Sequence, residues 1–218
     1  MLDRFKGFWQ GVVLMPFVRL FIRLGVSPDA VTLVGTLGVC AGALVFFPQV
    51  MLLTGVLVIT AFVFSDLVDG AMARQLGRSS KFGAFWDSTL DRIGDGAVFG
   101  GLVLYFAADG DSRLYLALSL FCLVMGSVTS YARARAESLG MDAKGGLAER
   151  ADRLVLILVA TGLGAIFDVP WLMYAALWIL AFANTYTVVF RVLKVRRQAL
   201  ALDAAADPAT GAAADPSV

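Results

Sequence analysis

Long apolar stretches alternate with short polar stretches through most of the chain. A helix needs about 20 mainly apolar residues to cross the hydrocarbon core of a bilayer, and six stretches approach or reach that length. The fifth stretch is the shortest, and we expect the residues around Arg150 to extend it. The six predicted transmembrane helices cover residues 31–47, 50–72, 82–107, 114–135, 154–167 and 171–192.

The two ends of the chain differ from these spans. Within residues 1–30, apolar side chains recur at steps of three or four among four basic residues, which is typical of an amphipathic helix on a membrane surface. Charges and Pro16 interrupt this segment, so it does not resemble a cleaved signal peptide. Residues 198–218 are rich in Ala, Asp and Pro, and we expect a disordered tail there. The membrane domain is then residues 31–197.

Composition and charge support an all-α integral membrane protein. Of the 218 residues, 59% are hydrophobic and 16% are charged, and the mean hydropathy is +0.80. The formal net charge is only +1. With both termini in the cytoplasm, nearly all Lys and Arg residues lie at the cytoplasmic ends of the spans, where such residues are favoured, and Arg113 is the exception. We therefore expect a multi-pass protein of the cell membrane, without a nucleic-acid partner.

Four aspartates flank the loop that joins the predicted second and third spans. Residues 66–74 read D-x-x-D-G-x-x-A-R, and residues 83–91 read G-x-x-x-D-x-x-x-D. On a soluble helix such residues would form a solvated face. A charge at the centre of a membrane helix, however, costs at least about 2.5 kcal/mol, which makes it a candidate functional site. The four residues are Asp66, Asp69, Asp87 and Asp91.

Helical geometry groups these aspartates into two pairs. Asp66 and Asp69 are about 60° apart on one helix, and Asp87 and Asp91 are about 40° apart on the next. Because the two helices are antiparallel neighbours, the pairs can face each other near the cytoplasmic surface. Four carboxylates would repel one another, and divalent cations relieve that repulsion. The chain has no histidine, so a metal at this place would have oxygen ligands from the carboxylates. Oxygen ligands favour Mg²⁺, Ca²⁺ or Mn²⁺.

Small residues and one arginine accompany the aspartates. Gly70 and Gly83 either pack helices together or let a ligand approach closely. Arg74 adds a permanent cation, which suits a phosphate oxygen. The combination with the aspartates favours a ligand site.

The whole run from residue 66 to residue 91 resembles the signature of the CDP-alcohol phosphatidyltransferase family and matches it at every fixed position. The resemblance implies transfer of a phosphatidyl or phospho-alcohol group from a CDP-linked donor to an alcohol, with release of CMP. It also implies a divalent metal, which we expect to be two Mg²⁺ ions with Mn²⁺ as an alternative. Members of the family resemble one another as homodimers with a site open to the cytoplasm.

The resemblance assigns roles to residues of this chain. It makes all four aspartates metal ligands, and Asp91 is also the proton acceptor. Residues that would contact CDP-diacylglycerol lie around the aspartates and at the start of the first span, although the latter position also fits a plain helix N-terminus after Pro28. The expected donor contacts are Asp29, Ala30, Val31, Thr32, Gly70, Arg74 and Ser80.

The expected reaction is attack of an alcohol on the β-phosphorus while Asp91 accepts the proton. Positioning and metal electrostatics would supply most of the acceleration. Asp95 lies one turn beyond Asp91 and outside the signature. We predict that it makes a buried polar contact, to Arg92, and is not a fifth metal ligand.

Arginines outside the signature bear on the acceptor. Positive-inside anchoring explains some of them, but their convergence from three helices favours a pocket for a phosphorylated alcohol. Three segments resemble the actinobacterial phosphatidylinositol-phosphate synthases within the family: residues 131–137, the Gly145-Gly146 loop followed by Glu149-Arg150-x-x-Arg153, and residues 91–99. That resemblance implies inositol phosphate as acceptor and phosphatidylinositol phosphate as product. The residues expected around the acceptor phosphate are Arg133, Arg135, Arg153 and Arg191.

Two alternatives stay open. A glycerol-3-phosphate acceptor would also need an arginine pocket, and the protein would then be a phosphatidylglycerol-phosphate synthase. A divalent-cation transporter would also place acids in a membrane. Its site, however, would normally lie near the midplane at broken helices, whereas these aspartates flank a loop and adjoin Arg74.

Overall fold

A computed structural model describes residues 15–77, 80–108, 112–147 and 149–206, without the side chains of Asp66, Leu67 and Ala206. All regular secondary structure in these residues is helical, which agrees with the predicted all-α class. In chain order the helices are α2 (Met15–Arg23), α3 (Pro28–Ala41), the π-helical η2 (Gly42–Phe46), α4 (Leu52–Val63), α5 (Ser65–Gln75), α6 (Lys81–Ala107), α7 (Arg113–Ser138), α8 (Arg150–Phe167) and α9 (Trp171–Ala206).

Serine side chains fix the starts of three of these helices. Ser27 caps α3 just before Pro28, Ser112 caps α7, and Ser80 caps α6 by accepting a hydrogen bond from the Gly83 backbone at 2.8 Å. A side-chain oxygen at this position satisfies a backbone N–H that the helix leaves without a partner. The cap at Ser80 therefore fixes the start of α6, which carries the second pair of aspartates.

Four helical stretches of the described chain are long and apolar enough to cross a membrane, as is typical of an integral membrane protein. They coincide with the first, second, fourth and sixth predicted spans. Helices α6 and α8 coincide with the third and fifth but carry several charged residues each, and α8 begins at Arg150 as expected. Six spans therefore stay a prediction. The four stretches are Pro28–Phe46, Leu52–Gln75, Arg113–Ser138 and Trp171–Ala205.

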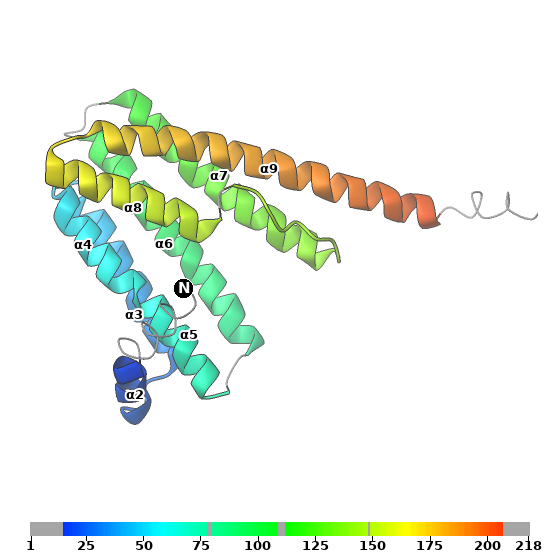
Figure 1. Cartoon of the computed structure of the whole chain (residues 1–218), viewed down its shortest axis with the longest axis horizontal. Helices are drawn as coiled ribbons and strands as arrows, with labels where there is room; N and C mark the ends of the chain where they lie inside the picture. The colour runs from blue at the N-terminus through cyan, green and yellow to red at the C-terminus, as the bar shows by residue number, and fades with distance from the viewer. Residues whose placement is uncertain (1–14, 78–79, 109–111, 148, 207–218) are drawn as a thin grey trace, which may run out of the picture.

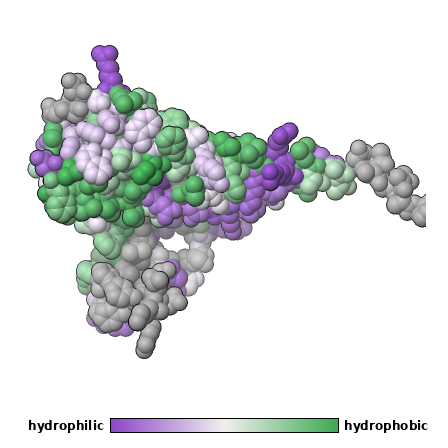
Figure 2. Space-filling view, turned by 45° about the horizontal axis from the view of Figure 1, so that its top comes forward, coloured by the Kyte–Doolittle hydropathy of each residue, from purple (hydrophilic) through white to green (hydrophobic). Residues whose placement is uncertain are grey.

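The long helices pack as a bundle, from which the end of α9 projects (Figure 1). Helix α7 packs on both α6 and α9, α3 packs on α4, α5 and α6, and α8 packs on α4 and α9. The largest buried side chains of the core include Phe47, Phe99 and Phe106. Figure 2 shows apolar residues over much of the broad end of the molecule and hydrophilic residues gathered along the margin of the part that carries α9. The bundle places the charged face of α6 toward α7 and α8.

The predicted second span is divided into α4 and α5 at Phe64. The hydroxyl of Ser65 donates a hydrogen bond of 2.6 Å to the carbonyl of Phe62. Such local side-chain bonds compete with the helix ladder and bend helices. The first two aspartates therefore lie on a short helix of their own.

Helix α9 is longer than the sequence suggests. It continues to Ala206, so residues 198–206, which we expected in the disordered tail, are helical. Alanine, leucine and arginine are strong helix formers, and Gln198 also donates a hydrogen bond of 2.6 Å to the carbonyl of Asp142. Residues 207–218 lie outside the described part of the chain.

Helix α2 lies within the predicted amphipathic segment, of which residues 1–14 fall outside the described part. It buries Val18 against α3 and α5, whereas Phe17 and Leu20 are exposed. An exposed apolar face beside arginines fits a helix on a membrane surface. That location stays a prediction.

Candidate functional site

The first pair of aspartates lies on α5, beside the start of α3. Asp69 is buried, and its carboxylate accepts a hydrogen bond from the hydroxyl of Thr32. This bond joins a predicted metal ligand to a predicted donor contact. Asp66 belongs to the same helix, but its side chain lies outside the described part.

The second pair lies on α6. Asp87 is exposed, whereas Asp91 is partly buried and faces α8. Arg150 Nη1 is 2.8 Å from Asp91 Oδ1, and Arg92 Nη2 is 3.8 Å from Asp91 Oδ2. The residue expected to accept the proton is therefore held by an ion pair with the first residue of α8.

The oxygen donors suit a hard divalent ion such as Mg²⁺ or Mn²⁺. Among the side chains that the structure describes, no three Asp, Glu, His or Cys residues are grouped closely enough to hold an ion, and this set does not include Asp66. The chemistry of the donor set fits a divalent metal. The arrangement of the four ligands around it stays a prediction.

The residues expected to bind the donor gather where α3 and α6 begin. Trp86 Nε1 donates a hydrogen bond of 3.2 Å to the carbonyl of Asp29, and a Cβ at Gly83 would lie 3.6 Å from the Asp29 carboxylate. Ser80 is exposed at the same place. The structure thus brings together two parts of the chain that are 57 residues apart in sequence.

Gly70 and Arg74 lie on α5 beside Asp69. Gly70 leaves space there, since a Cβ would meet only the Arg74 guanidinium, at 3.6 Å. The Arg74 side chain is exposed. Both residues can therefore be reached by a ligand approaching the aspartates.

An apolar cavity of about 390 Å³ adjoins the donor segment. It lies between α2, α3, α4 and α5, and its lining includes Phe21, Ala30, Val31 and Phe62. Two predicted donor contacts therefore border a space that suits hydrocarbon.

A larger cavity, of about 820 Å³, opens beside Asp91 between α6, α7, α8 and α9. Three carboxylates line it, from Asp91, Glu137 and Glu149. The excess of arginines over carboxylates favours an anionic ligand. The arginines are Arg92, Arg133, Arg150, Arg153 and Arg191.

Three of the four predicted acceptor residues thus meet at one cavity. Arg135, the fourth, is exposed, donates a hydrogen bond of 3.4 Å to Ser138, and does not belong to the lining. Arg133 also lies on α7, two residues earlier, and points to the cavity because a step of two residues reverses the face of a helix.

The arginines of the cavity differ in burial. Arg153 is 2% exposed and Arg191 is 3% exposed. Arg191 donates hydrogen bonds to the carbonyls of Thr129 at 2.6 Å and Gly145 at 3.2 Å. By contrast, the Arg133 side chain is 40% exposed and pairs with Glu137 at 3.0 Å. Arg153 and Arg191 are therefore fixed parts of the wall, whereas Arg133 is accessible.

Asp95 makes the predicted buried contact to Arg92, at 3.6 Å. It also accepts hydrogen bonds from Arg153 at 3.1 Å and Arg150 at 3.4 Å. The sequence did not indicate these two contacts, because they join residues 58 and 55 positions apart.

The loop between α7 and α8 lies against α9. Gly145 and Gly146 have φ of +106° and +121°, and a Cβ at Gly146 would lie 2.4 Å from Thr187 Cγ2. The backbone of Leu147 donates a hydrogen bond of 3.0 Å to the hydroxyl of Thr187. Only glycine fits this close approach, which fixes the carbonyl that Arg191 binds.

A polar contact holds the other end of this loop. Lys194 lies 2.8 Å from the Asp142 carboxylate, and the Lys144 backbone donates to the same group. These hydrogen bonds lower the pKa of Asp142. The contact is therefore intact above the ordinary pKa of an aspartate and is lost as the pH falls through the lowered value.

Known proteins of one family are similar to this chain. The model of the CDP-alcohol phosphatidyltransferase family matches residues 25–189. The chain is 53% identical over 211 residues to a phosphatidylinositol phosphate synthase of Streptomyces avermitilis, with 94% of this chain and 86% of that protein covered. It is 48% identical over 204 residues to the enzyme of the same name from Cutibacterium acnes, with 90% of this chain and 98% of that protein covered.

Solved structures are similar as well. The crystal structure of Mycobacterium tuberculosis phosphatidylinositol phosphate synthase with CDP-DAG bound superposes with a TM-score of 0.80 at 41% identity, covering 84% of this chain and 93% of that one. The same enzyme with manganese and citrate gives a TM-score of 0.81 at 41% identity, covering 84% and 88%. The chain therefore belongs to the CDP-alcohol phosphatidyltransferase family.

Proposed function

We propose that this protein transfers the phosphatidyl group of CDP-diacylglycerol to inositol phosphate, giving phosphatidylinositol phosphate and CMP, in a reaction that depends on divalent metal. The observation that carries the proposal is the arginine-lined cavity that opens beside Asp91. The relatives named phosphatidylinositol phosphate synthase support the same acceptor. Membership of a transferase family argues against the cation transporter.

The donor is CDP-diacylglycerol, which is bound in the similar structure from Mycobacterium tuberculosis. Its CDP group lies at the start of α3 and along α5, against Asp29, Thr32, Gly70, Arg74 and Ser80. Ala30 and Val31 continue this surface into the apolar cavity, and this lining supports a position of the acyl chains beside α2.

The acceptor phosphate lies in the larger cavity, near Arg133, Arg153 and Arg191. A phosphate group accepts several guanidinium hydrogen bonds. The side chains of Arg153 and Arg191 are buried and already ordered, so they lose little freedom when the phosphate binds. Arg135 is the remaining residue of the sequence prediction, and it lies outside the lining of this cavity.

Asp91 lies between the two substrates, because it borders the acceptor cavity and belongs to the aspartate motif. The acceptor hydroxyl forms a bond to the β-phosphorus, its proton passes to Asp91, and the bond from that phosphorus to the oxygen of CMP breaks. Asp66, Asp69, Asp87 and Asp91 would hold the divalent metal, which would neutralise charge on the pyrophosphate. We propose two Mg²⁺ ions, and the manganese in a similar structure supports dependence on a divalent ion.

The remaining features concern the membrane. We propose six spans with both termini and the site at the cytoplasmic face, since the basic residues cluster at that side. The homodimer and the surrounding membrane lipid stay predictions.

An acceptor panel tests the proposal. Purified protein receives radiolabelled CDP-diacylglycerol with inositol phosphate, glycerol-3-phosphate, inositol or serine, offered separately. Inositol phosphate should give the highest kcat/KM. A preference for glycerol-3-phosphate would make the protein a phosphatidylglycerol-phosphate synthase, and a preference for a neutral acceptor would contradict the phosphate pocket.

A further inference from the structure

One carboxylate outside the family signature meets three guanidinium groups. Asp95 lies one turn beyond Asp91 on α6 and is 6% exposed. Its Oδ2 accepts a hydrogen bond from Arg153 at 3.1 Å and lies 3.6 Å from Arg92 Nη2, and its Oδ1 accepts from Arg150 at 3.4 Å. A carboxylate has room for several donors, so these contacts can coexist.

Arg153 depends on this carboxylate because it is buried. A guanidinium that is removed from water destabilises the fold unless a counter-charge is close by. Gly126 on α7 gives the guanidinium its space, since a Cβ there would lie 3.3 Å from Arg153 Nε. Asp95 and Gly126 together therefore determine where this cation stands in the cavity wall.

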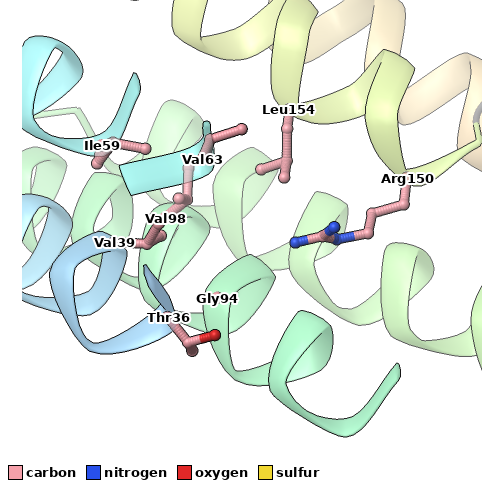
Figure 3. Close-up of a pocket in the computed structure, with 8 residues that line it drawn as sticks. All are labelled: Thr36, Val39, Ile59, Val63, Gly94, Val98, Arg150 and Leu154. Carbon is pink, nitrogen blue, oxygen red and sulfur yellow. The ribbon is translucent and has the colours of Figure 1, made fainter. Parts of the chain in front are cut away.

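Arg150 connects Asp95 with the reacting end of the cavity. It contacts Asp95 through Nε and Asp91 through Nη1. Figure 3 shows its guanidinium directed from α8 toward Gly94 of α6, among side chains that are mostly aliphatic. The small cavity at that point has a volume of only about 10 Å³, so Arg150 has little freedom on this side.

Side chains, and not close backbone packing, make this connection between helices. Helix α8 packs mainly on α4 and α9, whereas Asp95 belongs to α6. The orientation of the two arginines relative to Asp91 therefore depends on ion pairs that cross the cavity wall. Loss of the carboxylate would leave three neighbouring guanidinium groups that repel one another.

We infer that Asp95 is a positioning residue for the phosphorylated acceptor: it holds Arg150 and Arg153 in the orientation in which the cavity receives the phosphate. The inference rests on the proposed function for the identity of the acceptor. Donors that are already ordered bind an anion more tightly, because less side-chain entropy is lost on binding. The donor contacts lie on α3, on α5 and at Ser80, which caps the far end of α6 from Asp95. Asp95 therefore acts on acceptor binding and leaves donor binding unchanged.

The test is Asp95→Asn, with both KM values measured. The acceptor KM should rise about tenfold, as expected when one charge-assisted contact is lost, while the donor KM changes less than about twofold. Asp95→Glu retains the charge and should recover much of the loss. Asp152→Asn is the matched control, because it removes the same charge from the exposed face of α8, between Arg150 and Arg153, outside the cavity lining.

An unchanged acceptor KM, or equal increases in both KM values, would overturn the inference and leave Asp95 as a counter-ion for folding. If Asp95→Asn does not fold, Arg150→Gln carries the same test, with the same split between the two KM values expected. If both single variants fold, the variant that combines Asp95→Asn with Arg150→Gln should raise the acceptor KM by less than the product of the two single effects, because both substitutions remove the same contact.

Inorganic phosphate separates this inference from the proposed function. Phosphate should raise the unfolding temperature of the wild type and raise that of Asp95→Asn less. If the panel favours another phosphorylated acceptor, the proposed function fails, but the inference stands when the phosphate effect and the KM split are both seen. A phosphate effect of equal size in the two proteins, or none in either, refutes the role of Asp95.

Discussion

The arginines that line the larger cavity differ in their exposure to solvent. Arg133 keeps much of its side chain in solvent, whereas Arg191 is buried and donates to two backbone carbonyls. Removal of an exposed cation changes binding, while removal of a buried one also leaves carbonyls without their partner. The same substitution therefore has different consequences at the two positions.

The acceptor residues can be separated with a matched pair on α7. Arg133→Gln should raise the acceptor KM about tenfold with little change in unfolding temperature, because its guanidinium faces the cavity and is partly exposed. Arg135→Gln removes the same charge two residues away and outside the lining, so its effect should be smaller than about twofold. Equal effects of the two substitutions on the acceptor KM would contradict the pocket that we propose.

Asp91 has a different expected effect. Asp91→Asn should abolish turnover while largely sparing binding of CDP-diacylglycerol, because an amide cannot accept the proton of the attacking hydroxyl. Single-turnover rates and donor binding measured on the same preparation check this. Asp203→Asn, on the exposed end of α9, is the control. Normal turnover in Asp91→Asn would eliminate Asp91 as the proton acceptor.

At the scale of elements, the cavity depends on a loop that is held on α9. The loop supplies the carbonyl of Gly145 to Arg191 and leads directly into α8, whose first turn carries Arg150 and Arg153. Its position is set by Thr187, Lys194 and Gln198 of α9. Helix α9 therefore contributes to the site both directly, through Arg191, and by holding this loop.

Two glycines of this region make a matched pair. Gly140→Ala should lower the free energy of unfolding by about 1 kcal/mol, because its φ is +75° but no atom lies within 4 Å of the added Cβ. Gly146→Ala should lower it by at least about 3 kcal/mol, because a clash with Thr187 adds to the backbone strain. Thermal unfolding of both variants gives the comparison, and equal losses would mean that the contact with Thr187 is not tight.

The motif aspartates on α5 and α6 also predict that transfer activity depends on a divalent metal. Chelation of divalent ions should stop transfer, and added Mg²⁺ or Mn²⁺ should restore it, because Asp69 and Asp91 belong to different helices that a bound cation would join. Turnover before and after readdition is the measurement. Full activity in excess chelator would refute the metal scheme.

For the whole molecule, the distribution of charge matters more than its sum. A net charge of +1 conceals basic residues that lie almost entirely at the predicted cytoplasmic ends of the spans. The end of α9 projects from the bundle (Figure 1). This arrangement fits a site that receives a soluble phosphorylated alcohol from the cytoplasm and a lipid donor from the membrane.

Orientation in the membrane can be measured directly. A reporter that is active only in the cytoplasm should be active when it is fused after residue 206 and inactive when it is inserted between Ala108 and Ser112, because Lys and Arg favour the cytoplasmic side. The reverse result would contradict the proposed topology.

Local pattern determined much of this protein. Apolar stretches predicted helices at the right places. The aspartate motif indicated the reaction class through its resemblance to the family, and both signals depend on residues close in sequence. The helical end of α9 was not predicted, because helix propensity outweighed the composition typical of a disordered tail. The break at Phe64 was not predicted either, because one serine hydrogen bond interrupts a continuous apolar stretch.

The tertiary structure alone decided which arginines share a cavity and what holds them. Arg133 and Arg135 carry the same side chain and lie two residues apart on α7, but they point to opposite faces of the helix. Only the packing of α7 shows that the face with Arg133 lines the cavity. The contacts of Asp95 with Arg150 and Arg153 link α6 to α8 across more than fifty residues. A sequence pattern reports which residues share a helix face, whereas the packing of distant helices determines which faces meet.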